Sequence, residues 1–492
     1  MDARSKLLGL AAIVSFAGAC KLGPDYQRPS VPVPDGWRAV DTKEQASLAN
    51  TPWWELFQDP VLVDLIRTAL ADNQDLKIAV ERIEEARARY GFTKADLWPK
   101  VDLNAIGGGL RFNGGSLLHT PEADGVAKPT ETAIYSLSAD MSWEIDFLGR
   151  IRRATEAQKA LFLGTQEARR SAVLTLVADV ARAYFELRAF DLELEIARRT
   201  LASRREYREL ARDRFEGGLT PEVDLRQADA EMLRIEVVTY DIERKIRQAE
   251  NEISILIGRN PGPVLRGRAV TEQKRPGAVP AGLPSELLDR RPDIRVAEQN
   301  LAAATANIGQ AKALMFPRIA LTGSFGFTST EFDTWFDGPS KAWNILGNLL
   351  QPIFNAGKNR RRVEITESQQ RQTLYEYERT ILQAFRETED ALVAYQKTGA
   401  ERVAQASRVT AERKVLELAA LRYRGGVAAY LEVLDAQRSL FGAEIDEAQT
   451  ITENLVSLVQ LYKALGGGWP TAPETSGGST STPPPPPPSP AP

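Results

Sequence analysis

Reactive side chains are scarce in this sequence, and two carboxylates have the spacing that suggests chemistry. The chain holds one histidine, His119, and one cysteine, Cys20. These counts leave almost no material for a His/Cys metal site, a thiol nucleophile or a Ser-His-Asp arrangement. Glu432 and Asp435 are three residues apart, so a helix would place them side by side on one face. Crowded carboxylates attract cations and raise one another's proton affinity, although each could equally be an ordinary solvated helix charge.

The overall charge argues against a nucleic-acid partner. The chain carries 62 Lys and Arg against 66 Asp and Glu, a formal net charge of −4, and the two signs are interspersed. Nucleic-acid binding needs a basic field, which this pattern does not supply. No motif assigns acid-base work to the scattered carboxylates. We therefore expect no catalytic residues, no metal site and no nucleic-acid partner.

The amino terminus has the pattern of an export signal, which we assign to residues 1–19. Two basic residues precede an apolar run, Leu7 to Phe16, and small residues then lead into Cys20. The run is too short to span a bilayer. It resembles a bacterial lipoprotein signal, which implies a covalent lipid on Cys20 and no other cofactor; Lys21 resembles the residue found in lipoproteins sorted to the outer membrane. Ordinary signal cleavage beside an incidental cysteine is the alternative.

The paired carboxylates belong to a turn that the chain makes twice. Residues 214–228 read RFEGGLTPEVDLRQA, and residues 422–436 read RYRGGVAAYLEVLDA. The Gly-Gly pair in each copy can take the positive φ that ends a helix, and Thr220 with Pro221 predicts a cap and a preset first helical residue. Long Pro-free runs flank both turns. The pattern predicts two helical hairpins, with helices at about 150–215, 221–257, 357–424 and 430–465.

Strand patterns occupy the opposite ends of these runs. From Tyr135 to Ile145 apolar residues alternate with polar ones, and a similar alternation begins at Ile319. Period-two alternation is typical of a strand with one apolar and one polar face. We predict four strands, at about 99–111, 134–147, 317–328 and 343–354.

The two halves of the chain are copies of one another. Phe316-Pro317 matches Trp98-Pro99 at a helix end, and Gly357-Lys358 matches Gly149-Arg150 at a helix start. We therefore assign a first repeat to 59–257 and a second to 285–465, joined by a connector at 258–284. Residues 20–58 form a Pro-rich, acylated arm, and the Pro-rich tail 466–492 is expected to be disordered.

Four strands cannot close a membrane sheet by themselves. An open sheet in lipid would leave unpaired backbone edges that cost several kcal/mol per group. Three copies of the chain would supply twelve strands and twelve long helices, enough for two continuous tubes. A soluble β-sandwich and a soluble coiled-coil spacer remain alternatives for the strands and the rods taken separately.

The chain resembles the TolC/OprM-type outer-membrane efflux channels, in the acylated, NodT-type subgroup that serves resistance-nodulation-division (RND) pumps. The motifs that carry the resemblance are Cys20 with Gly23-Pro24-Asp25-Tyr26, Trp53-Trp54, Arg290-Arg291-Pro292-Asp293-Ile294, Phe316-Pro317-Arg318-Ile319, Tyr423 to Arg438, and Leu461 to Trp469. The resemblance implies a mainly α fold with a membrane β-barrel. In it a homotrimer forms a 12-strand outer-membrane barrel continued by a 12-helix periplasmic barrel. The implied partners are a periplasmic adaptor, an inner-membrane RND pump and outer-membrane lipid.

The resemblance also implies roles for both tips. Leu431, Glu432 and Asp435 would form the periplasmic gate, with Tyr423 and Arg424 as latch donors. Ala428 stands where related channels can have a basic residue, so part of their Arg-led lock is altered here. Tyr423 could instead simply pack the helix end, as Phe215 would in the first copy. The implied adaptor-docking surface is Gly217, Gly218, Leu219, Thr220, Gly425, Gly426 and Val427, although the glycines could serve only to end helices.

The implied function is a passive exit duct for small toxic compounds such as drugs, without catalysis of its own. A type I protein-secretion duct shares this fold and is one alternative. A non-channel periplasmic coiled-coil tether is another. Substrate identity does not follow from the sequence, because the resemblance implies that selection lies in the pump.

Overall fold

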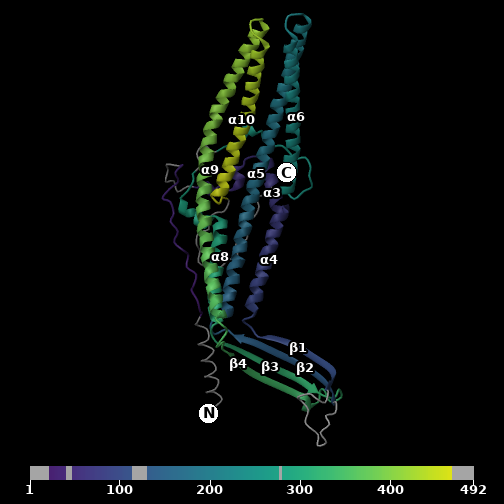
Figure 1. Cartoon of the computed structure of the whole chain (residues 1–492), viewed down its shortest axis with the longest axis vertical. Coiled ribbons are helices and arrows are strands. Elements are labelled where there is room, and N and C mark those ends of the chain that lie inside the picture. Colours follow the sequence, from purple (N-terminus) through teal and green to yellow (C-terminus); the bar gives the residue numbers. More distant parts are fainter. Residues whose placement is uncertain (1–20, 40–46, 113–129, 276–279, 468–492) are drawn as a thin grey trace, which may run out of the picture.

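The protein is an elongated body of helices with a sheet at one end and two helical tips at the other (Figure 1). This computed structural model describes residues 21–39, 47–112, 130–275 and 280–467. Cys20, His119 and the tail beyond residue 467, which figured in the sequence predictions, lie outside the described residues. Among the helices described, none is both long and apolar enough to cross a membrane.

The sheet contains four antiparallel strands in the order β1-β2-β3-β4. Their bounds are β1 Lys100–Phe112, β2 Thr130–Ile145, β3 Arg318–Ser329 and β4 Lys341–Leu350. Each lies within a few residues of the range predicted from alternation. The two outer strands, β1 and β4, pair on one side only within the described part of the chain.

The register gathers the apolar side chains on one face of the sheet. Ala139 of β2 stands opposite Leu103 of β1 and Phe325 of β3, and Phe325 stands opposite Trp343 of β4. The next row along, Asp140 opposite Ser324, is polar. Because neighbouring residues of a strand point to opposite faces, every second row is apolar. Leu103 and Trp343 are 77% and 72% exposed, so this apolar face is uncovered in the single chain.

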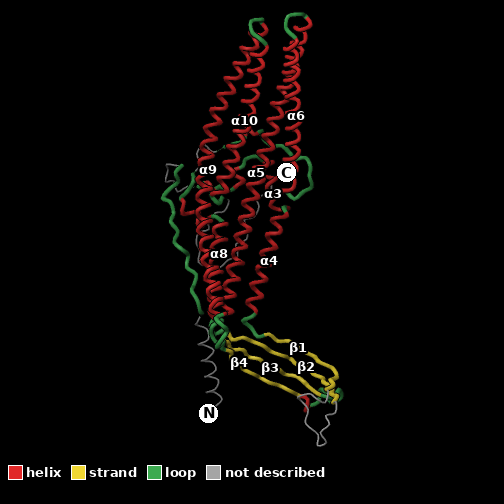
Figure 2. Tube along the Cα trace, in the orientation of Figure 1, coloured by secondary structure: helices red, strands yellow, loops and turns green. Residues whose placement is uncertain are grey.

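Two helices run the whole length of the helical body. Helices α5 Arg150–Glu216 and α9 Lys358–Arg424 have 67 residues each, about 100 Å at 1.5 Å per residue. Figure 2 shows α6 and α10 beside the tip halves of these rods, and α4 and α8 beside the halves nearer the sheet. The other helices are α2 Trp53–Leu56, α3 Pro60–Asp72, α4 Gln74–Ala95, α6 Glu222–Leu256, α7 Leu287–Arg290, α8 Pro292–Ala313 and α10 Tyr430–Ala464, with single 3₁₀ turns η1 Leu48–Asn50, η2 Val270–Glu272, η3 Pro284–Glu286 and η4 Gly338–Ser340.

Glycine marks the start of both rods. Gly149 and Gly357 precede α5 and α9 with φ of 78° and 79°, values that a residue with a Cβ rarely adopts. The chain can therefore turn sharply from a strand into a rod in each copy. At the starts of α3 and α4, side chains cap the backbone instead: Asp59 accepts from the Val61 N–H at 3.0 Å and Asn73 from the Leu76 N–H at 2.9 Å.

Most of the hydrophobic core lies midway along the body, where α3, α5, α6, α10 and the connector meet. Phe57, Ile66 and Tyr184 are among its buried members. A neighbouring cluster around Tyr377 and Tyr462 joins α8, α9 and α10 to the N-terminal arm. The rods are thus held together at their middle, and the tips and the sheet extend from this region.

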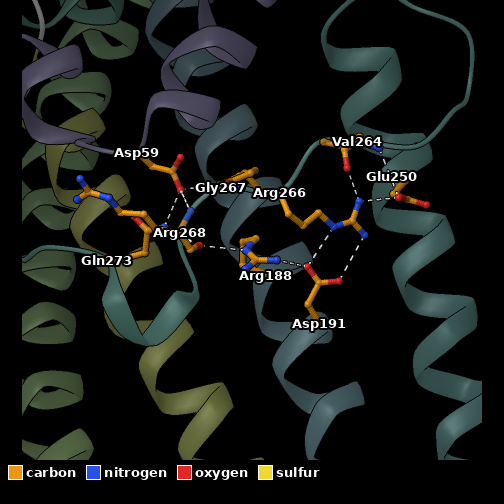
Figure 3. A network of polar contacts seen from close by, with 10 residues as sticks. Asp59, Arg188, Asp191, Glu250, Val264, Arg266, Gly267, Arg268 and Gln273 are labelled. Carbon is orange, nitrogen blue, oxygen red and sulfur yellow. Dashed lines mark hydrogen bonds and ion pairs between the residues drawn. The ribbon is translucent and has the colours of Figure 1, made fainter.

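A buried carboxylate fastens the connector to this core. Asp59 is fully buried, and its Oδ2 accepts from the Tyr184 hydroxyl at 2.9 Å, the Arg268 N–H at 2.9 Å and the Gln273 amide at 2.8 Å (Figure 3). Burial alone would raise the pKa of Asp59, but the hydrogen bonds from Gln273, Tyr184 and two backbone N–H groups hold it below its usual range. We call Asp59 with these partners the Asp59 node.

Arginines extend the Asp59 node across the connector. The Arg188 guanidinium donates to the Arg268 carbonyl at 3.0 Å, and Arg266 bridges Asp191 of α5 at 3.1 Å and Glu250 of α6 at 2.6 Å (Figure 3). Residues 264–273 are therefore held by polar contacts to α3, α5 and α6. This stretch of the connector, which the sequence analysis predicted only as a link between the repeats, therefore packs as part of the core.

Candidate functional site

Both tips have the same backbone construction. Gly218 and Gly426 have φ of 70° and 73°. The Leu219 N–H donates to the Arg214 carbonyl at 2.8 Å, and the Val427 N–H donates to the Arg422 carbonyl at 3.0 Å. Together with the bonds from the two glycine N–H groups, this is the Schellman arrangement that ends a helix. The glycines therefore do end the helices, whatever else they contact.

The residues expected at an adaptor-docking surface lie mostly in the open. Leu219 and Val427 are 74% and 70% exposed at the outermost turns. The glycine pairs Gly217-Gly218 and Gly425-Gly426 are exposed beside them, and a Cβ on Gly218 or Gly426 would meet nothing within 4 Å. Each tip thus presents a bare backbone turn with one apolar side chain at its apex.

The predicted cap at the first tip is wrong. Helix α6 begins at Glu222 with Pro221 as its N-cap residue, and no side chain caps it. The Thr220 hydroxyl is buried and has no hydrogen-bond partner among the described residues. Thr220 is one residue too early in the chain for its oxygen to reach the first free N–H groups of the helix. Thr220 is half-buried and therefore contributes less surface than its neighbours.

The paired carboxylates of the second tip lie on the exposed side of α10. Leu431, Glu432 and Asp435 are all exposed, whereas Val433 and Leu434 between them are buried. Glu432 pairs with Arg422 of α9, with 3.3 Å between Oε2 and Nε. The acidic face is therefore directed away from the core of its own hairpin, with one of its two carboxylates partly neutralised.

The two expected latch residues differ in their surroundings. Arg424 is exposed, but Tyr423 is 2% exposed and packs against the ring of Tyr430 at 5.6 Å between centroids. Its hydroxyl has no partner within the described chain. Packing of the helix end, the alternative role considered for Tyr423, describes its place in a single chain.

Arg214 is a tip residue that the sequence analysis missed. Its guanidinium lies 4.6 Å from the centroid of the Tyr423 ring and donates to the Tyr423 carbonyl at 3.1 Å. Arg214 thus reaches from the first hairpin to the second. The signal for it was present, because Arg214 and Arg422 are the identical first residues of the duplicated turn. The duplication does not reveal that one arginine crosses between hairpins and the other stays within its own.

Two buried glutamates join the hairpins farther from the tips. Glu231 of α6, its side chain fully buried, pairs with Arg438 of α10 at 2.9 Å, with Arg234 at 2.7 Å and with Arg204 of α5 at 3.7 Å. Burial would raise the pKa of Glu231, but hydrogen bonds from Arg234 and Arg438 hold it below its usual range.

The second buried glutamate, Glu444, lies on the other hairpin and pairs with an arginine of the first. Glu444 of α10 pairs with Arg199 of α5 at 2.7 Å and with Arg413 of α9 at 3.0 Å. Each hairpin therefore supplies a buried acid that takes an arginine from the other, and we call the two sets the cross-hairpin pairs. Sequence reasoning missed them because Arg/Glu alternation is general along these helices.

The chemistry available at the tips is electrostatic. Within the described ranges no group of three His, Cys, Asp or Glu residues could hold a metal ion. Exposed carboxylates, an apolar apex and arginine links can select charge, provide a contact surface and hold two hairpins together.

Comparison with known proteins agrees with this description. The profile of the family described as "Outer membrane efflux protein" matches residues 65–259 and 283–467, one match in each copy of the duplication. The chain is 37% identical over 473 residues to "Solvent efflux pump outer membrane protein SrpC" of Pseudomonas putida, covering 94% of this chain and 98% of SrpC. It is 34% identical over 471 residues to "Cation efflux system protein CusC" of Escherichia coli, covering 94% and 99%.

A solved structure gives the same fold. The outer-membrane channel OprN superposes with a TM-score of 0.83 at 31% identity, covering 92% of this chain and all of that one. The mainly helical fold with four strands per chain is thereby confirmed, as is the resemblance to efflux channels and the outer-membrane location. On these matches, which span both repeats, the chain belongs to the outer membrane efflux protein family.

Proposed function

We propose that this chain is the outer-membrane exit duct of a tripartite efflux pump and a passive channel for small toxic compounds. Three copies would close the four-stranded sheet into a twelve-strand membrane barrel and the helices into a twelve-helix periplasmic barrel. The duct has no catalytic step of its own. It is gated at the helical tips and anchored through a lipid on Cys20.

The sheet is the single observation that carries this proposal. Its uncovered apolar face is continuous across all four strands, and among the described residues both edges offer unpaired backbone groups. In water such a face would associate, and in lipid the edges must pair with further strands. Closure with two more copies satisfies both requirements, because the apolar face then turns toward lipid and the polar face toward the lumen.

The gate is assigned to the acidic face of α10. In a trimer Leu431, Glu432 and Asp435 would recur three times around the axis and form two carboxylate rings beside an apolar ring. The Arg422 pairing of Glu432 supports this assignment, since it keeps an exposed acid in a fixed position at the tip. Arg424 remains available as a latch donor toward a neighbouring copy.

The partners are assigned from the tips and from the relatives. SrpC and CusC are named as parts of efflux systems, which supports a pump partner for this chain. The exposed turns around Gly217–Thr220 and Gly425–Val427 would receive the hairpins of a periplasmic adaptor, which links the duct to an RND pump in the inner membrane. A protein-secretion role is less supported, because these relatives are named for the efflux of solvents and of cations.

Reconstitution tests the proposal directly. Full-length protein extracted from outer membranes should run as a heat-modifiable trimer and should conduct ions in planar bilayers. Expressed together with a periplasmic adaptor and an RND pump, it should restore resistance in a strain lacking its own duct. A soluble monomer or dimer without conductance would favour the coiled-coil tether and overturn the channel.

A further inference from the structure

Residues 21–25, the first described residues of the chain, pack against the junction between β2 and α5. We call this binding place, which has Arg153 at its centre and Gly309 beside it, the seat. The Leu22 N–H donates to the Leu148 carbonyl at 3.2 Å, three residues beyond the last residue of β2, Ile145. A Cβ added to Gly149 would lie 3.1 Å from the Lys21 backbone, so the two segments are in contact. From this point the arm follows the helices toward the middle of the body (Figure 1).

Arg153 of α5 is the centre of the seat. Its side chain is 1% exposed, and its Nε donates to the Leu22 carbonyl at 3.0 Å. Nη2 donates to the Gly23 carbonyl at 3.2 Å and pairs with Asp25 at 2.8 Å, while Nη1 pairs with Glu156 at 3.0 Å. A guanidinium has its donors in a fixed fork, so these contacts recognise one backbone path and one acidic residue.

Two glycines make room for the arm. Gly23 has φ of +88°, and a Cβ on it would lie 2.4 Å from the Gly309 Cα of α8. A Cβ on Gly309 would lie 2.4 Å from the Leu22 carbonyl oxygen and 2.9 Å from the Arg153 side chain. Both approaches are closer than real Cβ contacts. Residues 21–25 can therefore lie in the seat only because both positions lack side chains.

The counterpart positions of the duplication, Gly91 in the first repeat and Arg361 in the second, keep the residue types but lack these contacts in the single chain. Gly91 is the counterpart of Gly309, and a Cβ there would meet nothing within 4 Å. Arg361 is the counterpart of Arg153, yet its side chain is 77% exposed and pairs with Glu364 at 2.6 Å. Within the single chain, the burial and the backbone contacts of Arg153 thus come with the arm and do not recur at its counterpart Arg361.

We propose that Arg153 and Gly309 form a receptor for residues 21–25, which Gly23 allows to approach closely, and that this receptor fixes the segment at the strand–helix junction and so sets the position of the lipid anchor. The anchoring part rests on the proposed function, which assigns a lipid to Cys20; the receptor itself rests on the described contacts. Leu22 is two residues from Cys20, and two residues span at most about 7 Å. An acyl group on Cys20 is thereby kept beside the base of the sheet, at the membrane surface. Arg153 is a positioning residue in this proposal.

Tryptic cleavage after Lys21 measures occupancy of the receptor. The next arginine along the arm, Arg28, precedes a proline, so cleavage at Lys21 alone separates the anchor from the duct near this end. Full-length trimer in vesicles is digested, and the new amino terminus at Leu22 is quantified by mass spectrometry. Arg153→Met and Gly309→Val should accelerate this cleavage at least about tenfold, because cleavage follows the population of the opened arm.

The counterpart positions of the duplication supply matched controls. Arg361→Met and Gly91→Val make the same chemical changes at the counterpart positions and should leave the rate at Lys21 unchanged. Arg153→Lys, which keeps the charge but not the fork, should restore part of the protection. Should Arg153→Met fail to fold, Asp25→Asn removes one partner from an exposed position and should give a smaller acceleration.

A distance measurement separates positioning from general stability. Once Cys20 is acylated the chain has no other cysteine, so spin labels at Pro24→Cys and Lys100→Cys report the distance from the arm to the start of β1. Arg153→Met should broaden a narrow distribution at temperatures well below trimer melting. An unchanged distribution with wild-type cleavage would overturn the receptor. If Lys21 is protected although the intact mass shows Cys20 to be unacylated, only the anchoring role is overturned. If the wild-type trimer does not conduct ions, the proposed duct itself is contradicted.

Discussion

At the scale of single residues, Asp59 illustrates how one buried carboxylate can organise a linker. It accepts from a side chain of α5 and from two positions of the connector, and nothing larger than glycine fits at Gly267, where a Cβ would lie 2.1 Å from Asp59 Oδ1. An ionised acceptor satisfies three donors at once, which a neutral amide of the same shape does not.

Asp59→Asn should therefore lower the free energy of unfolding by about 2–4 kcal/mol at neutral pH, because an amide group would face donors in a buried site. The pKa of Asp59 is lowered by folding, so its ionised form stabilises the fold above the unfolded pKa of about 4 and this contribution is lost as the pH falls through the lowered value. Thermal unfolding followed by circular dichroism should show the variant and wild type converging below about pH 4. Asp64→Asn, on an exposed position of the same helix, is the control; a gap between Asp59→Asn and wild type that does not vary with pH would contradict the assignment.

The carboxylates of the second tip make a prediction about ion selectivity. Glu432→Gln combined with Asp435→Asn should move the cation/anion permeability ratio of the channel toward unity, because two rings of negative charge are removed from the mouth. Reversal potentials in planar bilayers under a salt gradient measure this ratio. Asp224→Asn, the counterpart of Glu432 at the first tip, should change it less. Unchanged conductance and selectivity in the double variant would remove the acidic face from the gate.

At the scale of elements, the cross-hairpin pairs hold α10 against α5 and α6. Glu231→Gln leaves Arg204 buried without a full countercharge, a change that costs about 3–5 kcal/mol when a buried pair is broken. We expect a lower melting temperature and, with Glu444→Gln added, a higher resting conductance as the second hairpin loosens.

An exposed pair in the same region provides the comparison. Arg198 and Glu243 join α5 to α6 within one hairpin at 2.8 Å, with side chains 63% and 43% exposed. Such a pair is worth at most about 1 kcal/mol. If Glu243→Gln proved as damaging as Glu231→Gln, the special role of the buried cross-hairpin pairs would be wrong.

The positions of the strands and of the helix ends could be predicted closely from the sequence pattern. The alternation from Tyr135 to Ile145 located β2 to within a few residues, and the glycine pairs located both tips, because these signals are local. The contact between Arg153 and Leu22 spans 131 positions, and the contact between Arg204 and Gln437 spans 233. No local signal marks such partners. Thr220 shows the opposite error, because a favourable cap residue lay one position away from where the helix begins.

At the scale of the whole molecule, long-range polar contacts are found at three levels of the helical body. The Arg153 seat lies at the sheet end, the Asp59 node at the middle and the cross-hairpin pairs toward the tips. Near the sheet end, α5 packs against α8 through small residues such as Ala160 and Ala303. A rod about 100 Å long cannot be aligned by a single core. Separate groups of polar contacts at the three levels therefore fix the position of the sheet relative to the helical tips.

The orientation of the sheet in a membrane gives the prediction that tests the assembled molecule. Ile345 and Asn344 are neighbours on β4, opposite Gly323 and Ser324, and they lie on different faces of the sheet. In a closed barrel Ile345 faces lipid and Asn344 faces the lumen. Ile345→Arg should cost about 2–4 kcal/mol, the penalty for arginine near the membrane midplane. It should therefore reduce the amount of heat-modifiable trimer in outer-membrane fractions.

Asn344→Arg should assemble normally and lower cation conductance, because it adds positive charge to the lumen. Equal assembly of both variants would show that the apolar face is covered by protein rather than by lipid, as in a soluble sandwich.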